Sequence, residues 1–272
     1  MDELDFEVEA RPTSGREFSS PRSFMGLVWL KIPAGEFWMG AENGRDNEKP
    51  CHLVHLPTYW IAQTPITNSQ YALFLQATGH LVPFHWENGQ MPQGKGNHPV
   101  VNVSWEDVVA LAKWVETEVG QPITLPSEAE WEKAARGGLV LPNGRNRLPK
   151  RRYPWGNVFN TRHCNTREAG LGETNPVDKY PHGASPYGVL EMSGNVWEWV
   201  RSRYEPYPYV AGDGREDMSR RNSFVLRGGA WNYQQELALV SYRNWDGSGE
   251  EYYNVGVRLV APSLLPAGLS YL

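Results

Sequence analysis

The sequence predicts a fold of many short elements joined by turns, rather than one of long helices or a doubly wound sheet. Its 272 residues include 27 Gly, 21 Pro, 12 Trp and 13 Tyr, which favours frequent turns between small packing units. Capped helix starts occur in the first half, whereas Gly, Pro and Asn interrupt the second half. With 40% hydrophobic and 21% charged residues, the composition is that of an ordinary globular chain with a buried core.

The charge balance argues against two classes of partner. The formal net charge of −5 provides no basic field for nucleic acid or for an anionic membrane. "PKRR", residues 149–152, is the one local basic run, and we interpret it as a solvated loop, with an anion site as the alternative. Two cysteines, Cys51 and Cys164, are too few for a disulfide framework. Because we also find no signal peptide and no apolar span, we expect a soluble, cytoplasmic protein.

The beginning of the chain predicts a tail and then a hairpin. Residues 1–24 are acidic and then rich in Ser, Pro and Arg, as is typical of a flexible segment. We expect the ordered domain to cover residues 25–262 and a C-terminal tail to cover residues 263–272. "GLVWLKIPAGEFWMGAEN", residues 26–43, alternates apolar residues on both sides of Pro33, Ala34 and Gly35. This pattern predicts two short strands that pair around a turn.

Helix starts follow, each with side chains that satisfy free backbone amides. A Ser or Thr precedes Gln, Asp or Glu by three residues, and a Gly ends each helix. These residues are Thr67 with Gln70 and Gly79, Ser104 with Asp107 and Gly120, and Ser127 with Glu130 and Gly137. The helices are expected to be short and amphipathic. In the second helix the apolar stripe consists of Trp105, Val108, Leu111, Ala112 and Val115.

The second half of the chain shows no helical period after Gly138. "SFVLRGG", residues 223–229, and "NVGVRLV", residues 254–260, are the apolar runs long enough for regular strands. We find no internal repeat and no linker within residues 25–262 that would separate two cores. The sequence therefore predicts a single domain.

Motifs in order along the chain resemble the formylglycine-generating enzyme (sulfatase-modifying factor) family. They are "IPAGEFWMG" (32–40), "HPVVNVSWEDVVALAKW" (98–114), "LPSEAEWEKAARGG" (125–138), "YPWGN" (153–157), "MSGNVWEW" (192–199), "LRGGAW" (226–231) and "NVGVRLV" (254–260). The resemblance covers residues 26 to 261 approximately. It implies a variant of the C-type lectin fold: an α+β structure with a small twisted antiparallel sheet, short helices and much irregular structure.

The resemblance also implies how catalysis would depend on cysteine. Enzymes of this family oxidise a substrate cysteine with a copper ion held by two cysteines, because soft Cu(I) needs thiolate ligands. Those positions correspond to Tyr233 and Ala238 here, and no Cys follows Cys164. Related sulfoxide synthases use iron held by histidines of an additional N-terminal helical domain, which we do not find in this sequence. We therefore expect neither copper nor iron, and no enzymatic activity.

The C-terminal segment, residues 231–260, has the composition of a recognition surface. Tyr and Trp provide large contact areas with little rotamer entropy to lose, and Ser, Gly and Asn provide adaptable hydrogen bonds. The expected ligand-binding residues are Asn232, Tyr233, Leu237, Leu239, Tyr242, Asn244, Asp246, Ser248, Tyr252 and Tyr253. The segment resembles the variable region of the C-type lectin proteins that diversity-generating retroelements diversify. The alternative is that its aromatic residues, Trp231 and Trp245 above all, fill a core.

Family members bind calcium at the segment that matches "MSGNVWEW". Carried over, the resemblance implies ligands at Gly194, Asn195, Val196 and Glu198, with Glu198 as the carboxylate. A second family site would correspond to Asn165 and Thr166. The alternative for Glu198 is a salt bridge inside the core.

Taken together, the sequence favours non-catalytic binding of a protein or another macromolecule, with calcium as a structural ion. An oxidoreductase of the family with an atypical site, and a regulatory or scaffolding domain, are the alternatives.

Overall fold

A computed structural model describes residues 24–219 and 223–262. The tails expected at residues 1–24 and 263–272 lie outside these ranges, apart from Phe24. Among the described residues, no helix has the length and apolar character needed to cross a membrane. The fold is α+β and C-type-lectin-like, as the resemblance implied, with small sheets and short helices.

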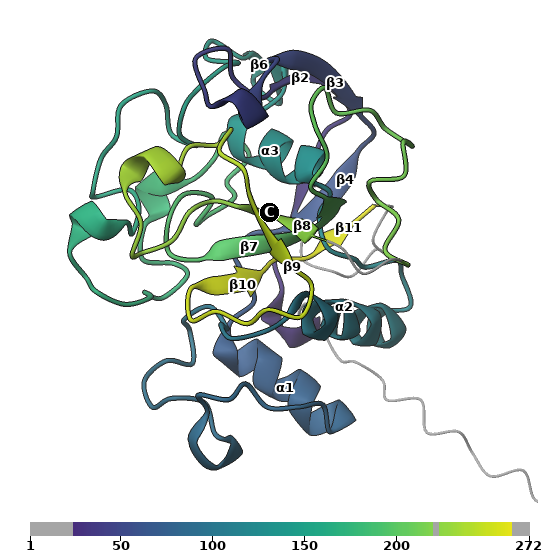
Figure 1. Cartoon of the computed structure of the whole chain (residues 1–272), viewed down its shortest axis with the longest axis vertical. Coiled ribbons are helices and arrows are strands. Elements are labelled where there is room, and N and C mark those ends of the chain that lie inside the picture. Colours follow the sequence, from purple (N-terminus) through teal and green to yellow (C-terminus); the bar gives the residue numbers. More distant parts are fainter. Residues whose placement is uncertain (1–23, 220–222, 263–272) are drawn as a thin grey trace, which may run out of the picture.

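A four-stranded sheet occupies the centre of the molecule (Figure 1). Its order is β10 (Val255–Val257), β7 (Trp197–Arg203), β8 (Ser223–Arg227) and β9 (Asn244–Gly247). The β7–β8 and β8–β9 pairs are antiparallel, whereas β10 is parallel to β7. The two apolar runs predicted as strands thus form β8 and, in the second run, β10 and the start of β11 (Val260–Ala261).

The hairpin predicted near residue 34 is wrong. Both strands exist, as β1 (Trp29–Ile32) and β2 (Gly35–Met39), but they do not pair with each other. β1 pairs with β4 (Tyr59–Ala62), which also pairs with β11, and β2 pairs with β3 (His52–Leu56). Pairing with distant strands places β1 and β2 in different sheets. The shortest hairpin joins β5 (Val140–Leu141) to β6 (Gly144–Arg145).

The predicted helices are confirmed, with the predicted caps. They are α1 (Asn68–Thr78), α2 (Trp105–Val119) and α3 (Glu128–Arg136), each opened by a capping box and followed by the expected Gly. The buried residues of α2 are the five of its predicted apolar stripe. Short 3-10 turns complete the structure at Phe24–Gly26, Asp46–Glu48, Glu87–Gly89, Arg167–Ala169, Pro181–Gly183 and Gln235–Leu237.

Helices cover both faces of the central sheet. Trp197 and Trp199 of β7 join a hydrophobic cluster with α1 and α2, and Val200 joins a second cluster with α3. Successive side chains of a strand point to opposite faces, which explains this division. Figure 1 shows α3 on one side of the sheet and α2 and α1 on the other.

The helix α3 differs from the amphipathic helix expected from its sequence, because all nine of its residues are buried. Its charged side chains find partners in other elements. Glu132 binds Arg227, and Glu128 binds Arg243 through both carboxylate oxygens, at 2.6 and 2.8 Å. On β7, Glu198 binds Arg258 through both oxygens, each at 2.7 Å. These pairs neutralise carboxylates that would otherwise be buried and charged.

Replacing Arg258 with Met is expected to lower the free energy of unfolding by about 3–5 kcal/mol, because it leaves the buried Glu198 carboxylate without its cation. Denaturation followed by tryptophan fluorescence measures the loss. Lys49→Met is the control, since Lys49 pairs with the fully exposed Asp46 and little change is expected. Equal losses in the two variants would contradict this assignment.

Candidate functional site

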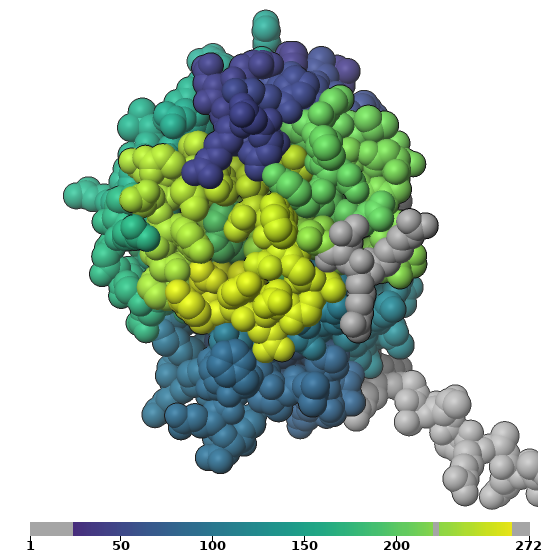
Figure 2. Space-filling model, in the orientation of Figure 1, coloured from purple at the N-terminus to yellow at the C-terminus, as the bar shows by residue number. Residues whose placement is uncertain are grey.

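The C-terminal segment crosses the middle of one face of the molecule, as the yellow-green and yellow atoms of Figure 2 show. Its inner side is fixed by Arg227, whose guanidinium donates to the carbonyl oxygens of Val240, Ser241 and Tyr242. Its outer side presents Tyr253 and Trp245, which are 56% and 49% exposed. The alternative interpretation, in which Trp245 fills a core, is therefore wrong.

Two of the predicted ligand-binding residues do not lie on this surface. Tyr242 is only 7% exposed, with its ring centroid 5.8 Å from that of Trp197. Ser248 is buried as well, and its hydroxyl donates to Glu106 Oε1 at 2.6 Å. Both side chains belong to the packing beneath the segment. The other predicted residues are partly or fully exposed, namely Asn232, Tyr233, Leu237, Leu239, Asn244, Asp246, Tyr252 and Tyr253.

One end of the segment forms a groove with a distant loop. This aromatic groove has a volume of about 470 Å³. Trp231 and Tyr253 line it from the C-terminal segment, and Phe84, His85 and Pro92 line it from the connection between α1 and α2. At its rim, Lys95 Nζ lies 2.6 Å from Glu173 Oε2. Aromatic walls with a polar rim are typical of a site that accepts an apolar side chain.

Hydrogen bonds hold Tyr253 in place at the groove. Asn232 Nδ2 donates to the Tyr253 hydroxyl at 3.1 Å, and Asn254 Nδ2 donates to Asn232 Oδ1 at 3.0 Å. The Trp231 and Tyr253 rings lie with centroids 5.8 Å apart. Such bonds fix the orientation of an exposed ring, which lowers the entropy lost when a ligand binds.

Phe84 and His85 were not among the binding residues predicted from the sequence. Phe84 is 74% exposed, and burial lowers the pKa of His85, whose Nδ1 lies 2.9 Å from Asn102 Nδ2. The signal was present in the run "LVPF", residues 81–84, where large apolar residues follow a helix end without any period of their own. Exposed apolar residues that cluster in a loop are typical of interaction sites.

The predicted calcium ligands divide into two groups. Both oxygens of Glu198 bind Arg258, and Trp131 Nε1 also donates to Oε2, at 2.7 Å. This carboxylate is engaged in a salt bridge inside the core, as in the alternative interpretation, and calcium coordination by Glu198 stays a prediction. Of the other predicted ligands, Asn195 instead forms a side-chain hydrogen bond with a second carboxylate, that of Glu191.

Glu191 lies in a buried group of oxygen atoms, here called the oxygen cluster: Asn165 Oδ1, Asn175 Oδ1 and Glu191 Oε2. None of these three atoms has a hydrogen-bond partner among the described residues. Asn195 connects them, since its Nδ2 donates to the Asn175 carbonyl and its backbone N donates to the Asn165 carbonyl, at 3.2 and 2.7 Å. Burial raises the pKa of Glu191 to about 8. Unsatisfied buried oxygens suit a hard cation such as Ca²⁺.

The backbone at the oxygen cluster depends on glycine. Gly194 has φ 77°, and a Cβ there would collide with the Asn165 carbonyl oxygen. Glu191 and Asn195 also have positive φ angles, 59° and 63°. Positive φ values at residues other than glycine concentrate at functional sites. Asn165, from the second predicted calcium site, thus lies in the same cluster, whereas the Thr166 hydroxyl donates to Glu168 Oε2 at 2.6 Å.

Comparison with known proteins identifies the family of this chain. The sulfatase-modifying factor enzyme 1-like domain matches residues 17–262. The chain belongs to that family. The formylglycine-generating enzyme of Streptomyces coelicolor is 31% identical, over 91% of this chain and 93% of its own length.

Two solved structures share the fold. PvdO from Pseudomonas aeruginosa has a TM-score of 0.71 and 25% identity, covering 86% of this chain and 93% of its own. Treponema denticola variable protein 1 has a TM-score of 0.70 and 21% identity, covering 87% and 95%. The relatives of this family domain therefore include an enzyme, and the shared fold extends to a variable protein.

In this member of the sulfatase-modifying factor family, the positions expected for the copper thiolates carry other side chains. The Tyr233 ring packs edge-on against Trp197, with centroids 5.7 Å apart. Ala238 is buried, and its carbonyl oxygen accepts from Ser193 Oγ at 2.6 Å. Both cysteines are free thiols, and Cys164 is buried. Within residues 24–219 and 223–262, no three His, Cys, Asp or Glu side chains gather in a way that could hold a metal.

Calcium is expected to raise the melting temperature of the protein, because it would stabilise the ionised form of Glu191 and give the free oxygens of the oxygen cluster a partner. Scanning fluorimetry of protein treated with EDTA and then with Ca²⁺ measures the shift. Glu191→Gln should abolish the response, and Glu250→Gln, at an exposed carboxylate, should keep it. A melting temperature that is the same with EDTA and with Ca²⁺ would count against the ion.

Proposed function

We propose that this chain is a non-catalytic, ligand-binding member of its family, and that the aromatic groove accepts a segment of a protein partner. The observation that carries the proposal is a difference in the C-terminal segment, where other residues occupy the positions expected for copper ligands. Tyr233 and Ala238 stand where the enzymes have copper ligands, and the same segment displays Tyr253 and Trp231 at an open groove. Aromatic side chains held in fixed orientations are typical of a binding surface.

The groove has the features of a peptide anchor site. Phe84 and Tyr253 are largely exposed large side chains on its walls, and burying them under a ligand would remove apolar surface from water. The Lys95–Glu173 pair and His85 provide polar contacts at the rim. An apolar or aromatic side chain of the partner would enter the groove, and its backbone would cross the rim.

The segment also meets the structural requirement of a diversified surface. Asn232, Asn244 and Asp246 lie outside the core, whereas Arg243 and Gly228 are buried. Substitutions at Asn244 and Asp246 would leave the buried packing unchanged. This supports the further proposal that the segment varies among copies of the protein.

Protein supplied with Cu(I) and a cysteine-bearing peptide is expected to form no aldehyde, because it offers no thiolate pair to the metal. Mass spectrometry of the peptide, with the Streptomyces coelicolor enzyme as positive control, measures the product. Copper or iron should also remain far below one equivalent after dialysis against a chelator. Stoichiometric metal together with peptide oxidation would establish an enzyme instead.

Selection of a displayed random-peptide library on the immobilised protein is expected to enrich peptides with aromatic or aliphatic anchors. Tyr253→Ala and Phe84→Ala should each weaken binding at least about tenfold, since each removes one wall of the groove. Trp245→Ala is the matched control, because Trp245 is equally exposed but does not line the groove. Enrichment that is indifferent to Tyr253 and Phe84 would contradict recognition by this groove.

A further inference from the structure

A second hollow lies apart from the aromatic groove and shares no lining residue with it. Its volume is about 580 Å³. Its walls come from residues 40–44, from Cys51, from Arg136 at the end of α3, from residues 150–152, and from Leu239 and Ser241. In Figure 2 the segment around residues 40–50, dark purple, lies at the opposite end of the face from the blue segment that includes residues 84–92. We call this second site the basic hollow.

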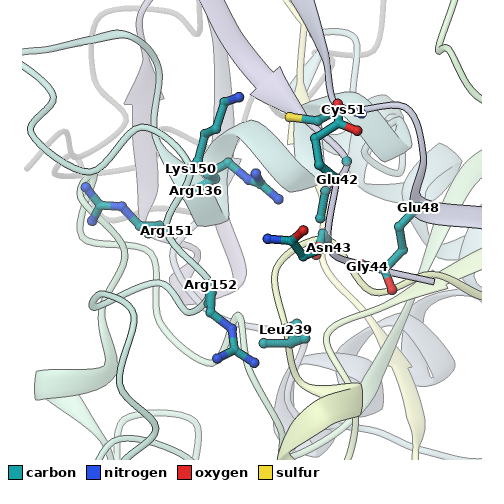
Figure 3. A pocket seen from close by; sticks show the side chains of 13 residues that line it. Glu42, Asn43, Gly44, Glu48, Cys51, Arg136, Lys150, Arg151, Arg152 and Leu239 are labelled. Atoms are coloured by element: carbon teal, nitrogen blue, oxygen red, sulfur yellow. Dashed lines mark hydrogen bonds between the residues drawn. The ribbon is translucent and has the colours of Figure 1, made fainter. Parts of the chain in front are cut away.

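Arg136 is the buried cation of the basic hollow. Its side chain is 3% exposed, and its Nη2 lies 2.9 Å from Glu132 Oε1. Its Nε has no hydrogen-bond partner among the described residues. A buried donor without an acceptor costs free energy that a bound acceptor would recover. Figure 3 shows this guanidinium directed from α3 into the space between Lys150 and Glu42.

Lys150 and Arg152 are two exposed cations that line the basic hollow together with Arg136. Lys150 Nζ lies 3.9 Å from the centroid of the Trp38 ring, and Arg152 lies 6.0 Å from that of Tyr153. Neither forms an ion pair with a carboxylate in the described part of the chain. Both remain available to a ligand, and the aromatic rings fix where their side chains stand.

Arg151 plays a different role in the "PKRR" run. Its guanidinium donates to the carbonyl oxygens of Leu148 and Pro154 and to Asn146 Oδ1, at 3.1, 3.0 and 2.8 Å. Figure 3 shows it pointing away from the other cations. Arg151 therefore stabilises the conformation of the loop that contains Lys150 and Arg152. The interpretation of this run as a merely solvated loop is incomplete.

The carboxylates of the basic hollow stand on the opposite wall and are already engaged by backbone amides. Glu42 Oε1 accepts from Cys51 N at 3.1 Å, and Glu48 Oε1 accepts from Arg45 N at 3.0 Å. Figure 3 places Glu42 and Cys51 across the space from Arg152. Glu42 and Glu48 thus stand on a different wall from Lys150 and Arg152 and form no ion pair with them among the described residues, whereas Arg136 is paired with Glu132.

We propose that the basic hollow binds the anionic group of a small ligand, a phosphate or a carboxylate, with Arg136, Lys150 and Arg152 as its donors. Charge-assisted hydrogen bonds to such oxygens are stronger than neutral ones, and a guanidinium matches their planar spacing. The partly buried setting strengthens the attraction relative to an open surface. This site is independent of the aromatic groove and of its occupant.

Cys51 provides a reporter at the wall of the basic hollow. It is the accessible thiol of the pair, because Cys164 is buried. Burial raises the pKa of the Cys51 thiol, and Lys150 and Arg136 pull that pKa down, as expected for cations close to it. A ligand in the hollow would cover the sulfur and slow its alkylation by iodoacetamide.

The test titrates the full chain with inorganic phosphate, with pyrophosphate and with succinate, at an ionic strength held constant with NaCl. Calorimetry measures affinity, and the alkylation rate of Cys51 with and without anion locates the site. Saturable binding of at least one anion, with severalfold protection of Cys51, is expected. The double variant Lys150→Gln, Arg152→Gln should weaken that binding at least about tenfold and remove the protection.

Arg147→Gln is the matched control, since Arg147 is an exposed arginine of the same loop that does not line the basic hollow. It should retain both affinity and protection. Phosphate or pyrophosphate binding without succinate binding would identify a phosphate ligand, and the reverse a carboxylate ligand. No saturable binding of any of the three anions, or equal binding in the double variant and the control, would overturn the proposal.

Discussion

The fold depends on the pairing of charges that α3 and the central sheet bury together. Each carboxylate of this layer needs a cation, because an isolated buried charge is strongly destabilising. Glu132 and Arg227 are 95 residues apart, and Glu128 and Arg243 are 115 residues apart. In these two pairs α3 supplies the carboxylates and the second half of the chain supplies the arginines. The pairs therefore couple α3 to the irregular C-terminal region.

The same arginines position the recognition surface. Arg227 binds three consecutive carbonyl oxygens at residues 240–242, and Arg243 reaches the carbonyl oxygens of Asn47 and Glu205. The inner side of the C-terminal segment is thus fixed by strong bonds to charged groups, although it has little regular secondary structure. Exposed residues of its outer side, such as Trp245 and Tyr253, can therefore face a ligand from a rigid scaffold.

Local chemistry explains which elements could be predicted from the sequence. The caps of α1, α2 and α3 involve residues three or four apart, so Thr67 with Gln70 and Ser127 with Glu130 could be identified without tertiary information. The hairpin at β1 and β2 failed because pairing with β4 and β3 is decided by distant strands. The partner of Glu198 could not be identified from the sequence for the same reason, since Arg258 lies 60 residues away. The pattern of charged residues in α3 indicated an amphipathic helix because the arginines that pair with Glu128 and Glu132 are also far away in the sequence.

In the candidate sites too, features set by nearby residues could be predicted, whereas contacts between distant segments could not. Tyr253 was predicted from composition, whereas Trp231 was considered only as a core residue, and Phe84 joins them only through the packing of α1 and α2 beside the sheet. Arg136 reaches the basic hollow because α3 is buried, which its sequence did not indicate. Ala238 and Tyr233, at the positions where the resemblance places two thiolates, contribute packing and a carbonyl bond rather than buried charge. A frame held by ion pairs can therefore keep both surfaces in place without thiolates at these positions.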